Sequence, residues 1–255
     1  PAALSSTPRG AALLRDYGEV AARQLVGSIQ VHVPVGDADR TLAVHNALRG
    51  YLPEIAALAA AAPFHEGRDT GLASVRPLIC TQLPRQGVPP VITSWEDHVD
   101  DLSWGAGAGS ITDPGRWWWE LRPHVGFGTL EVRVPDVQPT VADTLGVVSF
   151  VHALICHLAA AHCDGMPLDA PPTWRIEENR WSALRDGVHG RLADLRTGQT
   201  EPTRQRLLRL IDHVEQHAPT GLDAARALVA DPALDRLRRA GLSGATSWLA
   251  EVFAP

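Results

Sequence analysis

Apolar residues in the N-terminal part of the chain recur at two spacings, one typical of helices and one typical of strands. Between residues 11 and 26 they fall near helical spacing until Gly27 ends the run, which predicts a helix. Residues 28–35 alternate instead, with apolar side chains on one side and Gln30 and His32 on the other. This alternation predicts a half-buried strand whose His32 side chain points away from the core.

Capping and proline signals predict two helices after this strand. Asp37 can cap a helix that runs to about residue 49, and Pro53 stands at the first position of an alanine-rich helix that ends before Pro63. Residues 64–90 are rich in turn signals and predict long loops. Long loops in a compact domain usually serve function or mobility.

A second group of elements is predicted in the middle of the chain. Ser94 and Asp97 form a capping box for a short helix to about residue 102, and the glycine-rich segment 105–109 is expected to be flexible. Strands are predicted at 117–122 and 128–134.

The C-terminal part reads mainly as helix. Thr140 opens a long apolar helix to about residue 162. Further helices are predicted near 174–186, 203–217, 222–230 and 232–252, with a short hairpin between 191 and 200. The strands are too few and too widely separated for a doubly wound sheet. The pattern therefore predicts an α+β fold with helices on one sheet face and a mostly helical C-terminal third.

Composition narrows the functional classes. The chain has 255 residues, of which 45% are hydrophobic, and this is enough for a substantial core. A net charge of −6 provides no global positive field for nucleic acid or an anionic membrane. All 23 basic residues are arginine, so only arginine forks can meet carboxylate or phosphate as side-chain cations.

The cysteines and the chain start suggest the setting of the protein. Cys80, Cys156 and Cys163 form no CxxC pair and no even framework, which favours a reduced, cytoplasmic compartment. No apolar run reaches the length that a membrane span needs. The missing initiating Met and the loop-like opening at residues 1–8 predict that the natural chain begins earlier.

The second predicted strand of the middle group carries the most chemistry. Glu131 and Arg133 project from the same side of it, as a carboxylate for a divalent metal beside an anion-binding fork. The alternative is a solvated strand face with a cross-strand salt bridge. His32 is similarly either a ligand or a hydrogen-bonded structural residue.

Other candidate residues are weaker on pattern alone. Arg76 and Arg68 lie in the loop-rich region and can hold a substrate carboxylate or be ordinary loop arginines. His152 and His157 stand five apart in an apolar helix, which favours packing and gives a zinc hydrolase little support. The chain has no glycine-rich phosphate-binding motif and no nucleophile elbow.

Five segments in the region 28–200 occur in a recognisable order. They are Gln30-Val31-His32-Val33, then Ala62-Pro63-Phe64 with the stretch from Gly67 to Pro77, then Trp119-Glu120-Leu121-Arg122-Pro123, then the stretch from Gly128 to Asp136, and finally Glu178-Asn179-Arg180-Trp181 through Gly187. In this order they resemble the type 2 glutamate–cysteine ligase family, and within it the YbdK-like carboxylate–amine ligases.

The resemblance implies a glutamine-synthetase-like fold with an antiparallel sheet. It implies that residues 1–255 are a single domain, the C-terminal part of the ligase catalytic domain. It also implies ATP and Mg²⁺ as cofactors, and an acyl phosphate made from a glutamate-type γ-carboxylate, which an amine such as that of cysteine then attacks. A cytoplasmic homodimer with small-molecule substrates, and with no nucleic acid or membrane partner, is the corresponding expectation.

The resemblance also implies roles for individual residues. Glu131 and His32 would be metal ligands, Arg133 would contact the transferring phosphoryl group, and Arg122 would be a second catalytic anion contact. Acyl phosphate formation depends on positioning and electrostatics and needs no protein nucleophile.

The remaining roles concern substrate and nucleotide. The resemblance implies that Arg76, with Arg68 in the same region, holds a substrate carboxylate. Three residues of the last segment would lie on the nucleotide side, namely Asn179, Arg180 and Arg185.

The chain also departs from the family pattern. It contains neither the Gly-x-Glu-x-Glu strand nor the further acidic segment that supply most metal-binding carboxylates, and Gln30 and Pro34 replace an imidazole and a glycine. Two other functions therefore stay open. One is a non-catalytic, degenerate ligase fold that acts as a binding or assembly subunit. The other is a histidine-based metal hydrolase, which would require stoichiometric Zn²⁺.

Overall fold

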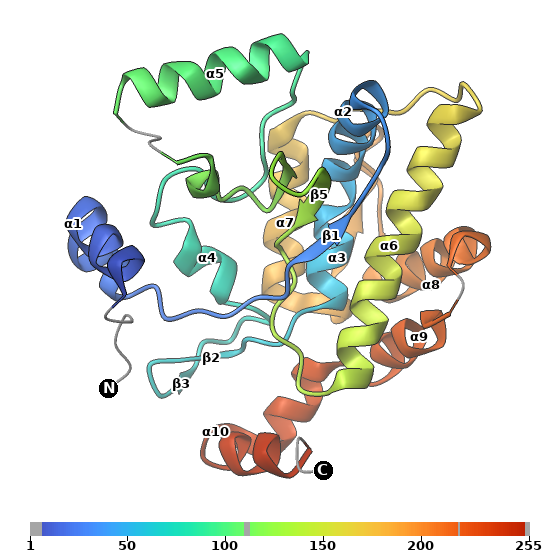
Figure 1. Cartoon of the computed structure of the whole chain (residues 1–255). Coiled ribbons are helices and arrows are strands. Elements are labelled where there is room, and N and C mark those ends of the chain that lie inside the picture. Colours follow the sequence, from blue (N-terminus) through green and yellow to red (C-terminus); the bar gives the residue numbers. More distant parts are fainter. Residues whose placement is uncertain (1–6, 110–112, 219, 253–255) are drawn as a thin grey trace.

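The computed structural model describes residues 7–109, 113–218 and 220–252 and shows helices around a small antiparallel sheet (Figure 1). The α-helices are α1 (Pro8–Ala22), α2 (Ala38–Leu48), α3 (Leu52–Leu58), α4 (Arg76–Cys80), α5 (Trp95–Gly107), α6 (Val141–Cys163), α7 (Thr173–Asp186), α8 (Thr203–Val214), α9 (Leu222–Ala230) and α10 (Ala233–Val252). The strands are β1 (Val31–Val33), β2 (Phe64–His65), β3 (Arg68–Asp69), β4 (Leu121–His124), β5 (Thr129–Val132), β6 (Arg191–Ala193) and β7 (Thr200–Pro202).

The predicted caps start three of the helices. Asp37, Ser94 and Thr140 each accept a hydrogen bond from the backbone N–H three residues further on, where α2, α5 and α6 begin. These bonds satisfy amides that the first helical turn leaves without a partner. The local signals therefore placed these helix starts correctly.

The central sheet has the strand order β1-β5-β4 and is antiparallel throughout. Its buried face consists of Val31, Val33, Leu121, Leu130 and Val132, which belong to the main hydrophobic core. Helices α6 and α2 contact this sheet, whereas α1, α4 and α5 lie apart from the core on the left of Figure 1. The predicted α+β class, an antiparallel sheet with the core helices on one face, is confirmed.

Helix α6 is the longest element of the core. A Cβ on Gly146 would lie 2.8 Å from the carbonyl carbon of Ala224, so only glycine allows α6 to approach α9 this closely. Among the described residues, α6 alone has the length and the mean hydropathy, 1.8, of a membrane span, so the prediction that no apolar run reaches that length was wrong. Half of that window is buried within the fold. Its packing against α2, α9 and β1 is that of a core helix.

All three strands predicted for the central sheet are shorter than expected, and β5 spans only Thr129–Val132 of the predicted 128–134. Pairing in β1 stops before Pro34, because proline has no N–H to donate to the ladder. The strand predicted at 117–122 begins only at Leu121, so the prediction of a strand at Trp117 was wrong. The guanidinium of Arg122 donates to the carbonyl group of Gly115, in the short 3-10 helix Pro114–Arg116, and to that of Trp117, in the irregular segment that follows.

Two segments predicted to be irregular contain regular structure. Helix α5 continues through Gly107, so the first part of the segment expected to be flexible is helical, and the intervening alanines favour this. The loop-rich region 64–90 contains the β2–β3 hairpin and α4. The loop expected at residues 1–6 lies outside the described residues.

His45 on α2 predicts a specific loss of stability in acid. The imidazole is fully buried, and burial lowers its pKa from 6.5 to about 4. Because the folded state disfavours the charged form, this contribution is present above pH 6.5 and is lost as the pH falls towards 4. The loss amounts to about 3 kcal/mol of unfolding free energy. Urea unfolding of wild type and His45→Gln across this range should show a shallower pH dependence in the variant. An unchanged slope would contradict the prediction, and His65→Gln, with a side chain 37% exposed, is the control.

Candidate functional site

The sheet face opposite the core carries a row of polar side chains in register. His32 on β1 and Arg122 on β4 both lie opposite Glu131 on β5, so the three side chains are neighbours across the sheet. The next row contains Gln30 and Arg133, and on the other side of Glu131 the row contains Thr129 and His124. We call this surface the polar sheet face.

Glu131 is at the centre of this face and is only 1% exposed. Its Oε2 accepts a hydrogen bond of 2.6 Å from Nε of Arg122, and its Oε1 accepts one from Arg133. Burial pushes the pKa of the Glu131 carboxyl upward, but the hydrogen bond from Arg122 and the charge of Arg133 outweigh burial and lower it. Glu131 is therefore an ionised carboxylate between two guanidinium groups.

The exposed Gln30 lies next to Glu131 and Arg133. With its amide oriented so that donors face acceptors, its nitrogen lies 3.1 Å from Oε1 of Glu131 and its oxygen 3.0 Å from a guanidinium nitrogen of Arg133. The amide thus fixes Arg133 without a titratable group.

His32 lies beside the carboxylate without a close bond to it. Its Nε2 is 3.9 Å from Oε1 of Glu131, and its Nδ1 is 3.0 Å from Oγ1 of Thr129. Burial lowers the pKa of this imidazole more than the charge of Glu131 raises it. The His32 ring is therefore predominantly neutral at pH 7.

A cavity of about 310 Å³ opens at the Arg133 end of the polar sheet face. Arg133, Arg76, Glu120 and Cys80 line it on the sheet and α4 side, and residues of α1 close the opposite wall. Glu120 is held on both oxygens by Arg180 at 2.6–2.9 Å. This cavity therefore combines arginine forks with one fixed carboxylate.

Arg76 reaches the cavity but is largely engaged elsewhere. Its Nε donates to Asp136 over 2.6 Å, and another guanidinium nitrogen donates to the carbonyl of Val134. The third nitrogen lies 4.0 Å from Sγ of Cys80. Burial tends to lower the pKa of Arg76, but Asp136 outweighs burial and raises it, so this arginine stays charged.

Of the predicted site residues, the structure gathers Glu131, His32, Arg122 and Arg133, with Arg76 at the adjoining cavity. Arg68 on β3 is not brought to this face. Its side chain is 77% exposed, and a guanidinium nitrogen lies 3.6 Å from Oε2 of Glu66. The sequence missed Glu120, although its two-residue spacing from Arg122 was a signal that both share a strand face.

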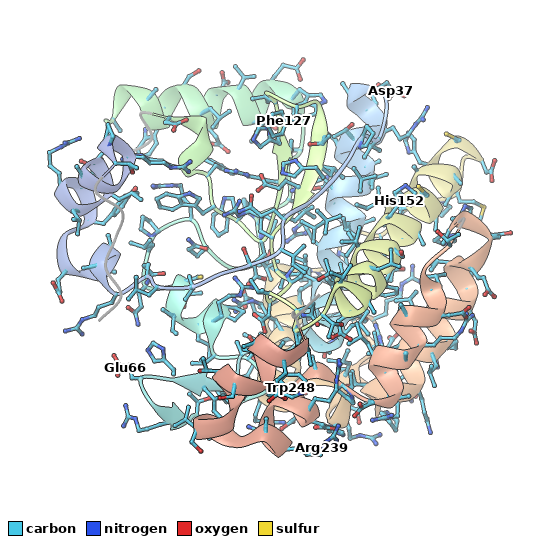
Figure 2. All side chains as sticks on the ribbon, turned by 60° about the horizontal axis from the view of Figure 1, so that its bottom comes forward. Asp37, Glu66, Phe127, His152, Arg239 and Trp248 are labelled. Atoms are coloured by element: carbon cyan, nitrogen blue, oxygen red, sulfur yellow. The ribbon has the colours of Figure 1, made fainter. Side chains whose placement is uncertain are left out.

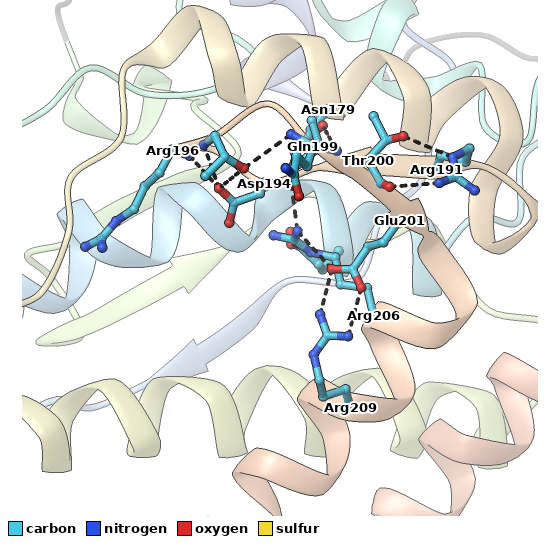
Figure 3. Close-up of polar contacts among 12 residues, drawn as sticks. Asn179, Arg191, Asp194, Arg196, Gln199, Thr200, Glu201, Arg206 and Arg209 are labelled. Atoms are coloured by element: carbon cyan, nitrogen blue, oxygen red, sulfur yellow. Dashed lines mark hydrogen bonds and ion pairs between the residues drawn. The ribbon is translucent and has the colours of Figure 1, made fainter.

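The predicted nucleotide residues make structural contacts. The Asn179 side chain donates to the carbonyl of Ala193 and accepts from its N–H, which secures β6 in the network of Figure 3. Arg180 is buried against Glu120, and Arg185 is exposed and pairs with Asp186. Arg180 thus reaches the candidate site only through Glu120.

The described residues of this face do not fit a magnesium ion. Mg²⁺ prefers an octahedral set of oxygen ligands, whereas both oxygens of Glu131 are bound by arginine and the next donor is the imidazole of His32. Within the described parts of the chain, no three His, Cys, Asp or Glu side chains gather as a metal-binding group. The polar sheet face is therefore suited to an anion, and the hydrolase hypothesis finds no described zinc site.

A larger cavity, of about 710 Å³, lies elsewhere, between α6, α7 and α8. One of its histidines lies within hydrogen-bonding distance of two others. Nδ1 of His157 is 3.3 Å from Nε2 of His217, and Nε2 of His157 is 3.2 Å from Nε2 of His213. The residues that line this cavity do not include the charged groups of the polar sheet face, so we place the candidate site at the smaller cavity, where the arginines converge.

Comparisons with known proteins agree with this fold. The structure resembles the crystal structure of the glutamate–cysteine ligase of Francisella tularensis in complex with AMP, with a TM-score of 0.67 and 14% sequence identity over 94% of this chain and 64% of that chain. The fold is thus that of a glutamate–cysteine ligase. A model of the glutamate–cysteine ligase family 2 (GCS2) matches residues 2–251. The chain belongs to this family.

Curated relatives show the same membership and a difference in length. A protein of Thermobifida fusca named "Putative glutamate--cysteine ligase 2" is 37% identical over 78% of this chain and 50% of its own length. A glutamate–cysteine ligase of Haloquadratum walsbyi is 38% identical over 65% of this chain and 46% of its own length. A relative from Gloeobacter violaceus is 33% identical over 90% of this chain and 62% of its own length. The chain thus spans about half of the length of these relatives.

Proposed function

We propose that this chain is part of an ATP-dependent carboxylate–amine ligase of the glutamate–cysteine ligase type. The observation that carries the proposal is the Glu131 carboxylate clamped between Arg122 and Arg133 on one face of the sheet, in a chain of this family. The clamp fixes two guanidinium groups where a phosphoryl group needs them. The AMP bound to the Francisella relative supports nucleotide binding here.

The proposed reaction makes an amide in two steps. A γ-carboxylate oxygen of a glutamate-type substrate attacks the γ-phosphorus of ATP, ADP leaves, and an acyl phosphate forms. The amine of a second substrate such as cysteine then attacks the acyl carbon, and phosphate leaves. Arg133 and Arg122 would offset the negative charge that develops on the phosphoryl oxygens, since preorganised donors are the main contribution a protein makes to such a transfer.

The substrate side of the proposal rests on the adjoining cavity. Arg76 and Arg133 offer guanidinium groups to a carboxylate, and Glu120 faces the same space. Mg²⁺ remains an expectation from the family resemblance. Because the described residues do not fit that ion, the groups of this chain that would offset the negative charge of the phosphoryl oxygens are arginines. The homodimer and the cytoplasmic location also remain predictions.

One observation favours the second candidate, a non-catalytic binding or assembly subunit. Both oxygens of the Glu131 carboxylate are already occupied by arginine. In such a protein the polar sheet face would bind an anion or nucleotide without turning it over.

Amino-acid-dependent release of ADP from Mg-ATP by the purified chain separates the two candidates. We expect release that needs both glutamate and an amine, tested with a panel that includes cysteine, and loss of release in Arg133→Gln. No release from a chain that binds ATP would overturn turnover by this chain itself, which would then be an incomplete or a degenerate ligase.

A further inference from the structure

Phe127 is an aromatic side chain exposed at the tip of the β4–β5 hairpin, where Figure 2 labels it. Its exposed fraction is 71%. Gly128, with φ +64°, forms the tight turn that follows it and has no atom within 4 Å of an added Cβ. The hairpin therefore presents a large apolar ring to solvent next to open space.

Two histidines hold this ring from behind. The ring of His124 stacks on Phe127 with centroids 4.4 Å apart and an interplanar angle of 13°. His32 meets both rings edge-on at 5.3 Å. We call these three residues the hairpin-tip stack. Because the stack supports Phe127 on one side, a ligand can lie on the exposed surface of the ring without reordering it.

The hairpin-tip stack is continuous with the polar sheet face. His32 is 3.9 Å from Glu131, and His124 lies opposite Thr129 in the ladder. Thr129, Glu131 and Arg133 follow one another on one face of β5, so the face extends about 13 Å from the row of the stack to Arg133 at about 3.3 Å per residue. An aromatic surface thus stands at one end of a track that has arginines at its middle and its far end.

We propose that the hairpin-tip stack binds the base of a nucleotide, whose phosphates run along the polar sheet face towards Arg133. This inference rests on the proposed function and deepens it by naming the base subsite. Of the residues that the resemblance assigned to the nucleotide, Asn179 and Arg180 are buried in structural contacts, and the exposed Arg185 pairs with Asp186. Aromatic rings bind bases through their flat faces.

Isothermal titration of the full chain with ADP and with inorganic tripolyphosphate tests the proposal, because the second ligand carries phosphates and no base. Removal of a stacking ring costs a bound base roughly 5-fold to 150-fold in affinity. We expect Phe127→Ala to weaken ADP binding by about that factor and to leave tripolyphosphate binding unchanged. Phe127→Tyr should bind ADP like wild type, since the flat ring is kept.

Two control variants separate stacking from general damage. Val125→Ala removes another exposed side chain of the same hairpin, 67% exposed, and should leave both ligands unaffected. Trp104→Ala removes an aromatic ring, 73% exposed, from α5 and should do the same.

The inference and the proposed function fail in different ways. Equal ADP affinity in wild type and Phe127→Ala overturns the base subsite, and so does an equal loss of tripolyphosphate binding in Phe127→Ala. Retained binding of both ligands in Arg133→Gln overturns the phosphate track on which the proposed function depends.

Discussion

Glu131→Gln is expected to lose the proposed ligase turnover and to destabilise the fold by about 3–5 kcal/mol, the usual cost of removing one partner from a buried ion pair. The substitution keeps the volume of the side chain but removes the charge that both Arg122 and Arg133 contact. Arg122 is itself only 7% exposed, so water cannot replace the lost counter-charge there. The two guanidinium groups would then repel each other across a neutral amide. Urea unfolding gives the free energy, and ADP release gives the turnover.

The double variant Glu131→Gln/Arg133→Gln identifies the cause of this loss. Because it also removes one of the repelling charges, we expect it to be less destabilised than the sum of the single variants. Asp169→Asn breaks the exposed pair with Arg196, whose side chains are 58% and 76% exposed, and should change stability by about 1 kcal/mol or less. A Glu131→Gln chain with wild-type stability and turnover would remove Glu131 from the site.

Arg76→Ala is expected to have the second large effect, again about 3–5 kcal/mol of unfolding free energy. Asp136 is 3% exposed and would be left with a buried charge, although its second oxygen would still accept the N–H of Ala61 at 2.9 Å. Arg68→Ala is the matched control, because this exposed arginine should change stability by no more than about 0.5 kcal/mol. A loss in Arg76→Ala as small as that of the control would mean that the pair with Asp136 is not needed.

Arg76→Lys separates folding from substrate binding. Lysine keeps a positive charge near Asp136 but cannot reproduce the planar fork that also meets Val134. If Arg76 also holds a substrate carboxylate, this variant should raise the KM for the amino acid more than the KM for ATP. Equal changes in the two KM values would assign Arg76 to the fold alone.

The sequence predicted most helices because their signals are local. Asp37, Ser94 and Thr140 cap amides three residues away, and this bond does not depend on the rest of the chain. The alternation around Glu131 likewise predicted which side chains of β5 face the core and which face outward. The errors came where a proline or a contact with another segment acts, as before β4, where Arg122 donates to the carbonyl groups of Gly115 and Trp117.

The candidate site shows the same division. The motifs selected Glu131, Arg122, Arg133 and His32, and strand pairing then brought them together as neighbours. No spacing in the sequence indicates that Arg76 pairs with Asp136, or that the side chain of Asn179 bonds the backbone of Ala193. These partners are brought together only by folding.

By itself, the sequence determined the fold class, the positions of most helices and the residue types that can meet an anion, since hydrophobic period, caps and composition are properties of short segments. The tertiary structure alone decided which charged side chains pair with one another and which guanidinium groups line a cavity. It also decided that Phe127 is exposed at the end of the polar sheet face. Those outcomes depend on burial and on distances between segments far apart in the chain, and both exist only after packing has removed water from between them.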